Sequence, residues 1–362
     1  MATSKGYRYV PDVVSAPGET LREVLEDRGI SQADFATRLG KTEKFVSQLI
    51  NGKAPISPQT ALDLQRVLGV SAAFWNNAEA LYRGYLARKA EEEELAKSAQ
   101  WAKRFPLKAM ADNKWVARET SQAEQAEELL SFFGVASPDA WEQYWSSPKR
   151  LAARMTKAFE PDTVALSAWL RRGELEAEQI ETGPFEPKAF ESVLRELRAL
   201  TREPVELWQE ALREQCAAVG VAVVFVPELP KIRCHAVSRW LSPAKALIQL
   251  CLRYKTDDQL WFGFFHEAAH LLKHGKKRTF ISDIDPDSAE EAEANRFAGD
   301  LLIPAGEYRD FLLGHEPSRE RVTAFAEQLG IAPSIVVGRL QHDGYVPFSQ
   351  MNDLKQKLEW AQ

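Results

Sequence analysis

The segment His266-Glu-Ala-Ala-His270 constrains the fold of this chain more than any other feature of its sequence. On an α-helix, residues four positions apart lie on one face, so both histidines can bind a single Zn²⁺ ion. Glu267 lies one position round the helix, where its carboxylate can take a proton from a water molecule at the metal. The preceding run Leu260–Phe265 is strongly apolar and predicts that this helix is buried. We therefore expect a zinc-dependent hydrolase site with Glu267 as its catalytic base.

A catalytic zinc site needs a third protein ligand and one open position. The later segment Ser288–Pro304 offers three glutamates on a predicted helix. Glu291 is the preferred ligand, because Asn295 follows four residues later on the same face and can hydrogen-bond a ligand histidine. Glu293 is the alternative ligand. Glu290, like whichever of the other two is not the ligand, is expected to be a surface acid.

Other polar residues of this part of the chain are weaker candidates. His235 is a candidate for stabilising an oxyanion in the same site, and Tyr308 is a second candidate for that role. His274 lies eight residues after the first motif histidine, whereas the third histidine of a metzincin lies ten after it, so we expect a structural or surface residue. His315 and His342 are expected at the surface.

The amino-terminal part of the chain predicts a separate site. Short helices with clear start and stop signals follow one another there, and the pair between Gly29 and Gly52 has the size of a helix-turn-helix. The exposed side of its second helix carries polar side chains that suit the major groove of DNA. The residues expected to contact bases or phosphates are Gln32, Thr42, Glu43, Lys44, Ser47, Gln48 and Lys53.

The charge of the chain is unevenly spread. Its 46 Lys and Arg against 52 Asp and Glu give a net charge of −6, which argues against a protein whose whole surface binds nucleic acid. Residues 1–90 hold 12 basic and 9 acidic residues, a net +3 that leaves −9 for the rest. We therefore expect a small DNA-binding surface attached to an acidic body that contacts protein.

Cysteine usage and hydropathy indicate the compartment. The three cysteines, Cys216, Cys234 and Cys251, are odd in number and have no CxxC spacing, which argues against a secreted disulfide framework. The first residues have no apolar signal core, and no stretch reaches the roughly 18 apolar residues of a membrane helix. We expect a cytoplasmic protein without membrane contact.

The predicted fold is multidomain. Residues 1–90 are expected to form an all-α helix-turn-helix bundle, 91–190 a helical middle region of unknown role, and 191–362 an α+β domain. The α+β assignment depends on two strand-like runs, Val221–Val226 and Ala246–Leu252, which precede the apolar helix of the histidine motif.

The run SQADFATRLGKTEKFVSQLINGKAPISPQTALDLQRVLGVSAAFW resembles the Cro/C1-type (XRE) helix-turn-helix family, and specifically its HigA-antitoxin branch. The shared pattern is NGKxxI, then an alanine-rich helix, then GVSxxFW. This resemblance implies a homodimer that binds operator DNA.

Residues 195–345 resemble the ImmA/IrrE family of metallopeptidases, which are minimal gluzincins with a zincin-like fold. The matching pieces are VAVVFV, RWLSPAKALIQLCLRYK, FFHEAAHLLKHGKK and EEAEANRFAGDLLIP. The resemblance implies that His266, His270 and Glu291 bind zinc and that Glu267 is the catalytic base. It also implies a substrate class, namely helix-turn-helix repressors whose cleavage releases their regulon.

Two functions follow from these observations. The first is a DNA-binding transcriptional regulator with a zinc-dependent endopeptidase domain that cleaves a repressor or partner protein. The alternative is a HigA-like antitoxin or autorepressor of a toxin-antitoxin module, in which the carboxy-terminal domain is an interaction or sensor module without turnover. In the alternative the protein partner is a toxin.

Overall fold

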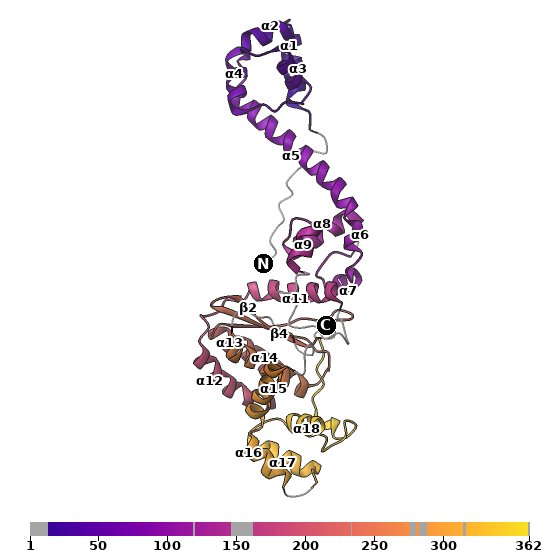
Figure 1. Ribbon diagram of the computed structural model, residues 1–362, viewed down its shortest axis with the longest axis vertical. Coiled ribbons are helices and arrows are strands. Elements are labelled where there is room, and N and C mark those ends of the chain that lie inside the picture. The colour runs from indigo at the N-terminus through magenta and orange to yellow at the C-terminus, as the bar shows by residue number, and fades with distance from the viewer. Residues whose placement is uncertain are drawn as a thin grey trace. The chain divides into compact units, whose positions relative to one another are not determined.

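The computed structural model describes residues 14–118, 120–145, 162–232, 234–275, 280–281, 288–313 and 316–360. Contacts divide the chain into two compact units, residues 1–97 and 98–362, which we call the amino-terminal and carboxy-terminal units (Figure 1). The chain is mostly helical, and its carboxy-terminal part is an α+β region, as expected. The finer division of the sequence into three domains stays a prediction.

The amino-terminal unit consists of helices around a small apolar core. Its elements are α1 (Pro17–Asp27), α2 (Gln32–Leu39), α3 (Glu43–Ile50), α4 (Pro58–Leu68) and α5 (Ala72–Lys97). Ser31 begins α2 because its hydroxyl accepts a hydrogen bond from the Asp34 amide at 3.1 Å, and Gly40 ends it with a φ of 64°. The side chains of Phe35, Val46 and Trp75 are fully buried between these helices. The start and stop signals therefore place α2 and α3 as a helix-turn-helix pair.

The carboxy-terminal unit contains a small sheet and many helices. The strands are β1 (Val221–Phe225), β2 (Ala236–Ser242), β3 (Lys245–Leu250) and β4 (Phe280–Ile281). The helices before and between the strands are α6 (Ala99–Ala102), α7 (Leu107–Asp112), α8 (Gln122–Phe133), α9 (Pro138–Trp145), α11 (Thr163–Glu178), α12 (Pro187–Leu197), η1 (Arg198–Arg202), α13 (Val205–Ala218) and α14 (Asp257–Lys273). The later ones are α15 (Ala289–Leu302), α16 (Ala305–Leu312), α17 (Arg319–Leu329), α18 (Pro333–His342) and η2 (Asn352–Leu354). Among the described residues, no helix combines the length and the apolar character needed to cross a membrane.

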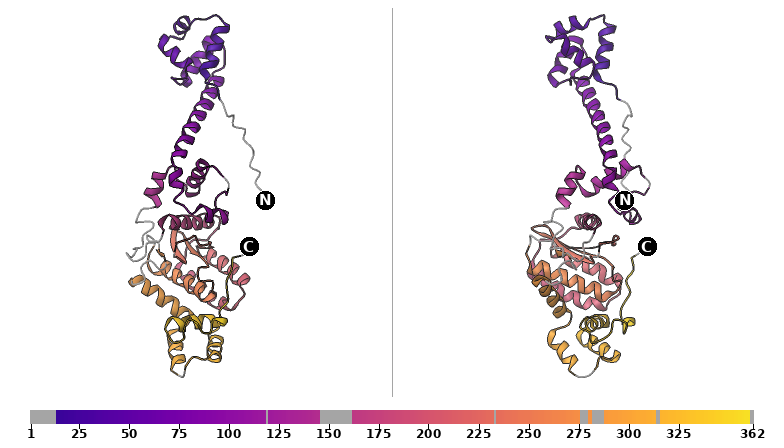
Figure 2. Two further views of the ribbon diagram at one scale, coloured as in Figure 1. Left: turned by 90° about the vertical axis from the view of Figure 1, so that its right-hand side faces the viewer. Right: turned by 45° about the vertical axis from the view of Figure 1, so that its right-hand side comes forward.

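The sheet has the strand order β1-β3-β2-β4, with β1 parallel to β3, and with β2 antiparallel to both β3 and β4. Because side chains alternate along a strand, its two faces differ. Ala246, Ile248 and Leu250 of β3 point into the main core, where α13 and α14 pack. Helix α11 packs against β1 and β3 on the other face (Figure 2). The sheet is thus covered on both sides, with α13 and α14 on one face and α11 on the other.

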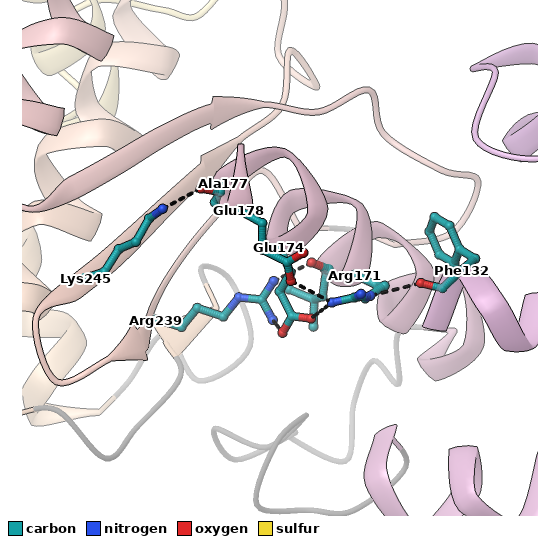
Figure 3. A network of polar contacts seen from close by, with 8 residues as sticks. Phe132, Arg171, Glu174, Ala177, Glu178, Arg239 and Lys245 are labelled. Atoms are coloured by element: carbon teal, nitrogen blue, oxygen red, sulfur yellow. Dashed lines mark hydrogen bonds and ion pairs between the residues drawn. The ribbon is translucent and has the colours of Figure 1, made fainter. Parts of the chain in front are cut away.

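Polar contacts fix α11 to its face of the sheet (Figure 3). Arg239 of β2 is 7% exposed, and its guanidinium donates to Glu174 of α11 at 2.9 Å and to a backbone carbonyl of the same helix. Gln249 of β3 donates to the Trp169 carbonyl at 2.7 Å. Lys245 donates to carbonyls at the carboxyl end of α11, where a cation is favoured by the helix dipole. These bonds orient α11 across the strands.

A second set of contacts extends from α11 to α8. Arg171 donates to the Phe132 carbonyl at 2.9 Å and pairs with Glu174, the same carboxylate that pairs with Arg239 (Figure 3). Helix α11 belongs to residues 91–190, for which the sequence predicted no role. In the structure it is a layer of the α+β fold.

Candidate metal centre and nucleic-acid interface

The histidine motif lies in the buried middle of α14. Its three polar residues are almost inaccessible: His266 is 5% exposed, Glu267 0% and His270 1%. The burial follows from the sequence, because Trp261, Phe264 and Phe265 on the remaining faces of α14 pack into the main core. The sheet and the helices α15 and α18 all contact α14.

Helix α15 contributes the third residue of the cluster. The Ser288 hydroxyl accepts a hydrogen bond from the Glu291 amide at 3.2 Å, which fixes Glu291 in the first turn of α15. Its carboxylate oxygens lie 2.9 Å from Nε2 of His266 and 3.2 Å from Nε2 of His270. The two Nε2 atoms are 3.0 Å apart. The structure thus brings together the three residues expected to bind metal, with their ligand atoms within 4.8 Å of one another.

These distances fit a tetrahedral zinc ion. Ligand atoms about 2.0–2.2 Å from the metal at tetrahedral angles are about 3.3 Å apart, and the observed separations need to widen by only a few tenths of an ångström. Two imidazole nitrogens and one carboxylate oxygen are also ligands that zinc prefers. Three protein ligands leave one position for water, as in catalytic zinc sites.

The electrostatics of the cluster keep its carboxylate ionised. Burial alone would raise the pKa of Glu291, but hydrogen bonds with both histidines hold it at about 2. Burial alone would lower the pKa of His266, yet the hydrogen bond to Glu291 and the charges of Glu267 and Glu291 raise it above its ordinary value. In the metal-free site, the two carboxylates therefore favour the protonated form of His266.

Asn295 contacts the first histidine of the cluster. Its Oδ1 lies 2.9 Å from Nδ1 of His266, at the position expected from the spacing of Glu291 and Asn295 on α15. An amide oxygen at Nδ1 favours the tautomer in which Nδ1 carries the proton and Nε2 is available to a metal.

His274 lies at the end of α14, where its side chain contacts His270. The sequence interpretation did not predict this contact. Its side chain is only 7% exposed, and its Nδ1 lies 2.8 Å from Nδ1 of His270. Its Nε2 lies 3.3 Å from a carboxylate oxygen of Glu293, whose side chain is 55% exposed. The spacing of four residues between His270 and His274 was the available signal, because it puts both rings on one helix face. Burial and the neighbouring His270 lower the pKa of His274.

His235 packs against the face of α14 that carries the cluster. A Cβ atom at Gly263 would lie 3.1–3.2 Å from two ring atoms of His235, so the ring rests directly on the helix backbone. Gly263 lies one turn before Glu267 on the same face, so His235 is placed on the same side of α14 as the cluster. Its ring also contacts Tyr254, with centroids 5.3 Å apart.

The remaining candidates lie elsewhere in the unit. The hydroxyl of Tyr308 donates to Asp343 at 2.9 Å, and burial together with that carboxylate raises its pKa. His342 is exposed at the end of α18, as expected, and Glu290 is half-buried. His315 lies outside the described residues.

A cavity of about 330 Å³ lies beside the cluster, between α14, α15 and α18. Phe262, whose ring contacts that of His266, and Asn295 line its near side. Ile335 and Arg339 of α18 line its far side. A side chain that enters this cavity would therefore lie next to the residues that hold the first ligand.

The second site is the exposed face of α3. Glu43 and Lys44 are exposed, and Ser47 and Gln48 are half-exposed, whereas Val46, Leu49 and Ile50 are buried. The four polar residues form one continuous strip, because their helical positions are adjacent on one side. Their polar groups can thus reach a duplex without disturbing the core.

Three further candidates flank this strip. The Thr42 hydroxyl accepts a hydrogen bond from the Phe45 amide at 3.2 Å and so begins α3, which leaves its hydroxyl proton for a phosphate. Gln32 is exposed at the first position of α2, and Lys53 is exposed just after α3. These placements suit contacts to the DNA backbone on either side of a recognition helix.

Comparison with protein families matches residues 21–75 to a helix-turn-helix family and residues 247–341 to the IrrE N-terminal-like domain. YddM of Escherichia coli, an uncharacterized HTH-type transcriptional regulator, is 32% identical over 63 residues, which are 17% of this chain and 67% of YddM. The chain is a helix-turn-helix regulator with an IrrE-like domain. The matched segments contain α2 and α3 in the first case, and all three cluster residues in the second.

Two solved structures are similar to part of this chain. A candidate antidote protein of a plasmid maintenance system from Nostoc punctiforme is 28% identical, with a TM-score of 0.23, and covers 23% of this chain and 92% of its own. An addiction module antidote protein of the HigA family from Coxiella burnetii is also 28% identical, with a TM-score of 0.21, and covers 23% of this chain and 91% of its own.

Proposed function

We propose that this regulator is a zinc-dependent endopeptidase that binds operator DNA through its amino-terminal unit and cleaves a repressor or partner protein with its carboxy-terminal unit. The observation that carries the proposal is the cluster of His266, His270 and Glu291, whose ligand atoms lie within 4.8 Å of one another, together with the buried Glu267 next to His266 in the chain. Packing alone does not explain why so many ionisable side chains are buried close together. Burial of an unpaired charge costs several kcal/mol per group, and clusters of this kind are typical of functional sites.

In this mechanism the three cluster residues hold the metal. When bound, zinc acts as a Lewis acid that makes a water molecule more acidic and polarises the scissile carbonyl. Glu267 takes the proton from the attacking water and returns it to the leaving amine, which its place one position from His266 on α14 allows. His235 lies on the same face of the helix and donates a hydrogen bond to the oxyanion. A side chain of the substrate enters the cavity lined by Phe262.

The same proposal assigns operator binding to α3. Lys44 and Gln48 contact bases, while Thr42, Lys53 and Gln32 contact phosphates. Binding requires two copies, because helix-turn-helix proteins of this kind read two half-sites one helical turn apart. Exposed apolar side chains on α4 and α5, Leu62, Phe74 and Leu81, offer surface that a second copy can cover.

The decisive experiment compares the purified protein with its Glu267→Gln variant. Each is incubated with candidate helix-turn-helix repressors, with and without a chelator, and cleavage is followed by gel and mass spectrometry. We expect a metal-dependent fragment from the wild type, and at least about 100-fold less from Glu267→Gln, which should retain zinc by elemental analysis. Glu327→Gln, at an exposed site on α17, is the matched control and should cleave normally. Equal cleavage by Glu267→Gln, or cleavage that survives chelation, would reject the proposed role.

The alternative function, a HigA-like antitoxin without turnover, is favoured by the sequence run from Ser31 to Trp75 that resembles the HigA branch. It predicts that the protein binds a small toxin encoded beside it and cleaves nothing. Size-exclusion chromatography with the product of an adjacent open reading frame distinguishes the two. A stable complex together with absent proteolysis would support the antitoxin.

A further inference from the structure

We infer that His274 is a positioning residue of the metal centre, which orients the ligand His270 and is itself held by Glu293. The inference goes beyond the ligand set and the catalytic base, and it rests on the proposed binding of metal by that set. It gives His274 a role other than the surface or structural one that its spacing suggests, and it gives Glu293 a role other than ligand.

Hydrogen-bond chemistry fixes the direction of the contacts. Nε2 of His270 faces the cluster, 3.0 Å from Nε2 of His266 and 3.2 Å from Glu291. A nitrogen that binds metal carries no proton, so the neutral His270 ring carries its proton on Nδ1. Nδ1 of His270 lies 2.8 Å from Nδ1 of His274, so His270 donates and His274 accepts.

The chain of hydrogen bonds continues from His274 to the exposed Glu293. With Nδ1 of His274 as an acceptor, the proton of its neutral ring is on Nε2, which lies 3.3 Å from the Glu293 carboxylate. A carboxylate can only accept, so one arrangement of protons satisfies both contacts. The two ligand histidines are thus held by different acceptors. His266 has the amide oxygen of Asn295, whereas His270 has an imidazole backed by a carboxylate.

A residue that only fills space would behave differently from a positioning residue. The His274 side chain is 7% exposed at the end of α14, so it also packs. Space filling predicts that an apolar side chain of similar size is accepted at this position. Positioning predicts that a side chain with an acceptor atom is needed, because without it Nδ1 of His270 loses the acceptor that lies 2.8 Å away.

The first test reads the tautomers directly. Full-length protein labelled with ¹⁵N in its histidine rings is loaded with zinc, and couplings between ring protons and nitrogens identify the protonated nitrogen of each ring. We expect His270 to carry its proton on Nδ1 and His274 on Nε2. The signals of His274 are assigned as those that vanish in His274→Gln. A His274 ring protonated on Nδ1 would overturn the inference.

The second test measures zinc affinity by competition with a chromophoric chelator, and coordination geometry from the visible spectrum of the Co²⁺-loaded protein. We expect His274→Leu to bind zinc about 10–100-fold more weakly and to change the Co²⁺ spectrum. His274→Gln, which keeps an acceptor, should recover most of the affinity. His342→Leu, the same change at an exposed histidine, is the control and should match the wild type.

The remaining outcomes of these tests distinguish a positioning role of His274 from a packing role. Wild-type affinity in His274→Leu, or equal loss in the Leu and Gln variants, would leave only a packing role and overturn the inference. If metal-free His274→Leu is unfolded by circular dichroism, Glu293→Leu replaces it, because that side chain is 55% exposed and its loss should not unfold α15. We expect a loss of a few-fold there, and an unchanged affinity would contradict the inference. Failure of the wild type to bind zinc would instead reject the proposed function.

Discussion

The two units hold their candidate sites in opposite ways. In the amino-terminal unit, the polar strip of α3 lies on the surface, and the core of Phe35, Val46 and Trp75 closes beneath it without contribution from the strip. In the carboxy-terminal unit, the cluster residues are themselves buried, with His266 at 5% and His270 at 1% exposure. The first site lies on the surface of its unit, whereas the second is built into the interior of its unit.

Because of this difference, substitutions are expected to have different consequences at the two sites. Side chains on an exposed strip can change without disturbing the core, so binding specificity can change while the fold stays the same. Each polar atom of a buried cluster needs a partner, so a substitution there affects neighbouring groups as well. The comparison predicts large, coupled effects in the metal centre and smaller, separable effects at the DNA-binding strip.

Loss of a ligand is the largest expected effect. His270→Ala removes one of three ligands and leaves Glu291 without one of its two histidine contacts, so zinc affinity should fall on the order of 1,000-fold or more. Chelator competition measures the affinity, and His342→Ala serves as the control. Operator binding by the same variant should stay at the wild-type level. A parallel loss of DNA binding would contradict the separation of the two sites.

The DNA-binding strip should respond next most strongly. Lys44→Ala together with Gln48→Ala removes one charge and one hydrogen-bonding amide, and we expect operator affinity to fall about 10–100-fold. An electrophoretic shift assay at fixed salt measures this change, and zinc content should not alter. Arg22→Ala removes one charge from the exposed side of α1, away from the apolar surface on α4 and α5, as a control. Wild-type binding by the α3 double variant would reject α3 as the recognition helix.

Much of the fold and of the cluster could be predicted because it depends on local spacing. Ser31 and Gly40 directly flank α2, and both act as expected. The choice of Glu291 over Glu293 depended on Asn295 four residues later, and the structure places both Glu291 and Asn295 against His266. Periodicity on one helix carries such information directly.

What the sequence did not reveal depends on contacts between distant segments. Arg239 and Glu174 are far apart in the chain, so the role of α11 as a cover for the sheet could not be read from either residue alone. His274 was compared with the spacing of a third ligand, and its contact with Glu293 requires the packing of α14 on α15. Tertiary packing, rather than local pattern, decides such roles.

The pH dependence of zinc binding tests the charges of the cluster. Because the pKa of His266 in the metal-free protein lies above its ordinary value, a proton competes with zinc, and affinity should fall by up to about tenfold per pH unit below that pKa. Glu291, with a pKa of about 2, stays ionised and adds no dependence in this range. Chelator competition between pH 5 and pH 8 measures the profile. A flat profile would contradict the proton on His266.

The same two groups make the stability of the metal-free protein depend on pH in opposite directions. The raised pKa of His266 means that its contribution is present at low pH and is lost as pH rises through that pKa. The lowered pKa of Glu291 means that its contribution is present above its ordinary value of 4.5 and is lost as pH falls toward 2. Bound zinc should abolish the loss of stability at rising pH, because it takes the place of the proton on His266.

The smallest expected effect distinguishes the units most cleanly, because the same bond begins a helix in each. The Ser31 hydroxyl caps α2 through the Asp34 amide at 3.1 Å, and the Ser288 hydroxyl caps α15 through the Glu291 amide at 3.2 Å. Replacing either serine with alanine should cost about 1 kcal/mol of local stability, seen as roughly fivefold faster amide hydrogen exchange in the capped helix. Only Ser288→Ala should also weaken zinc binding, by a few-fold, because the amide that it caps belongs to a ligand. Equal zinc affinity in the two variants would show that the position of Glu291 is set by its contacts with His266 and His270 rather than by the start of its helix.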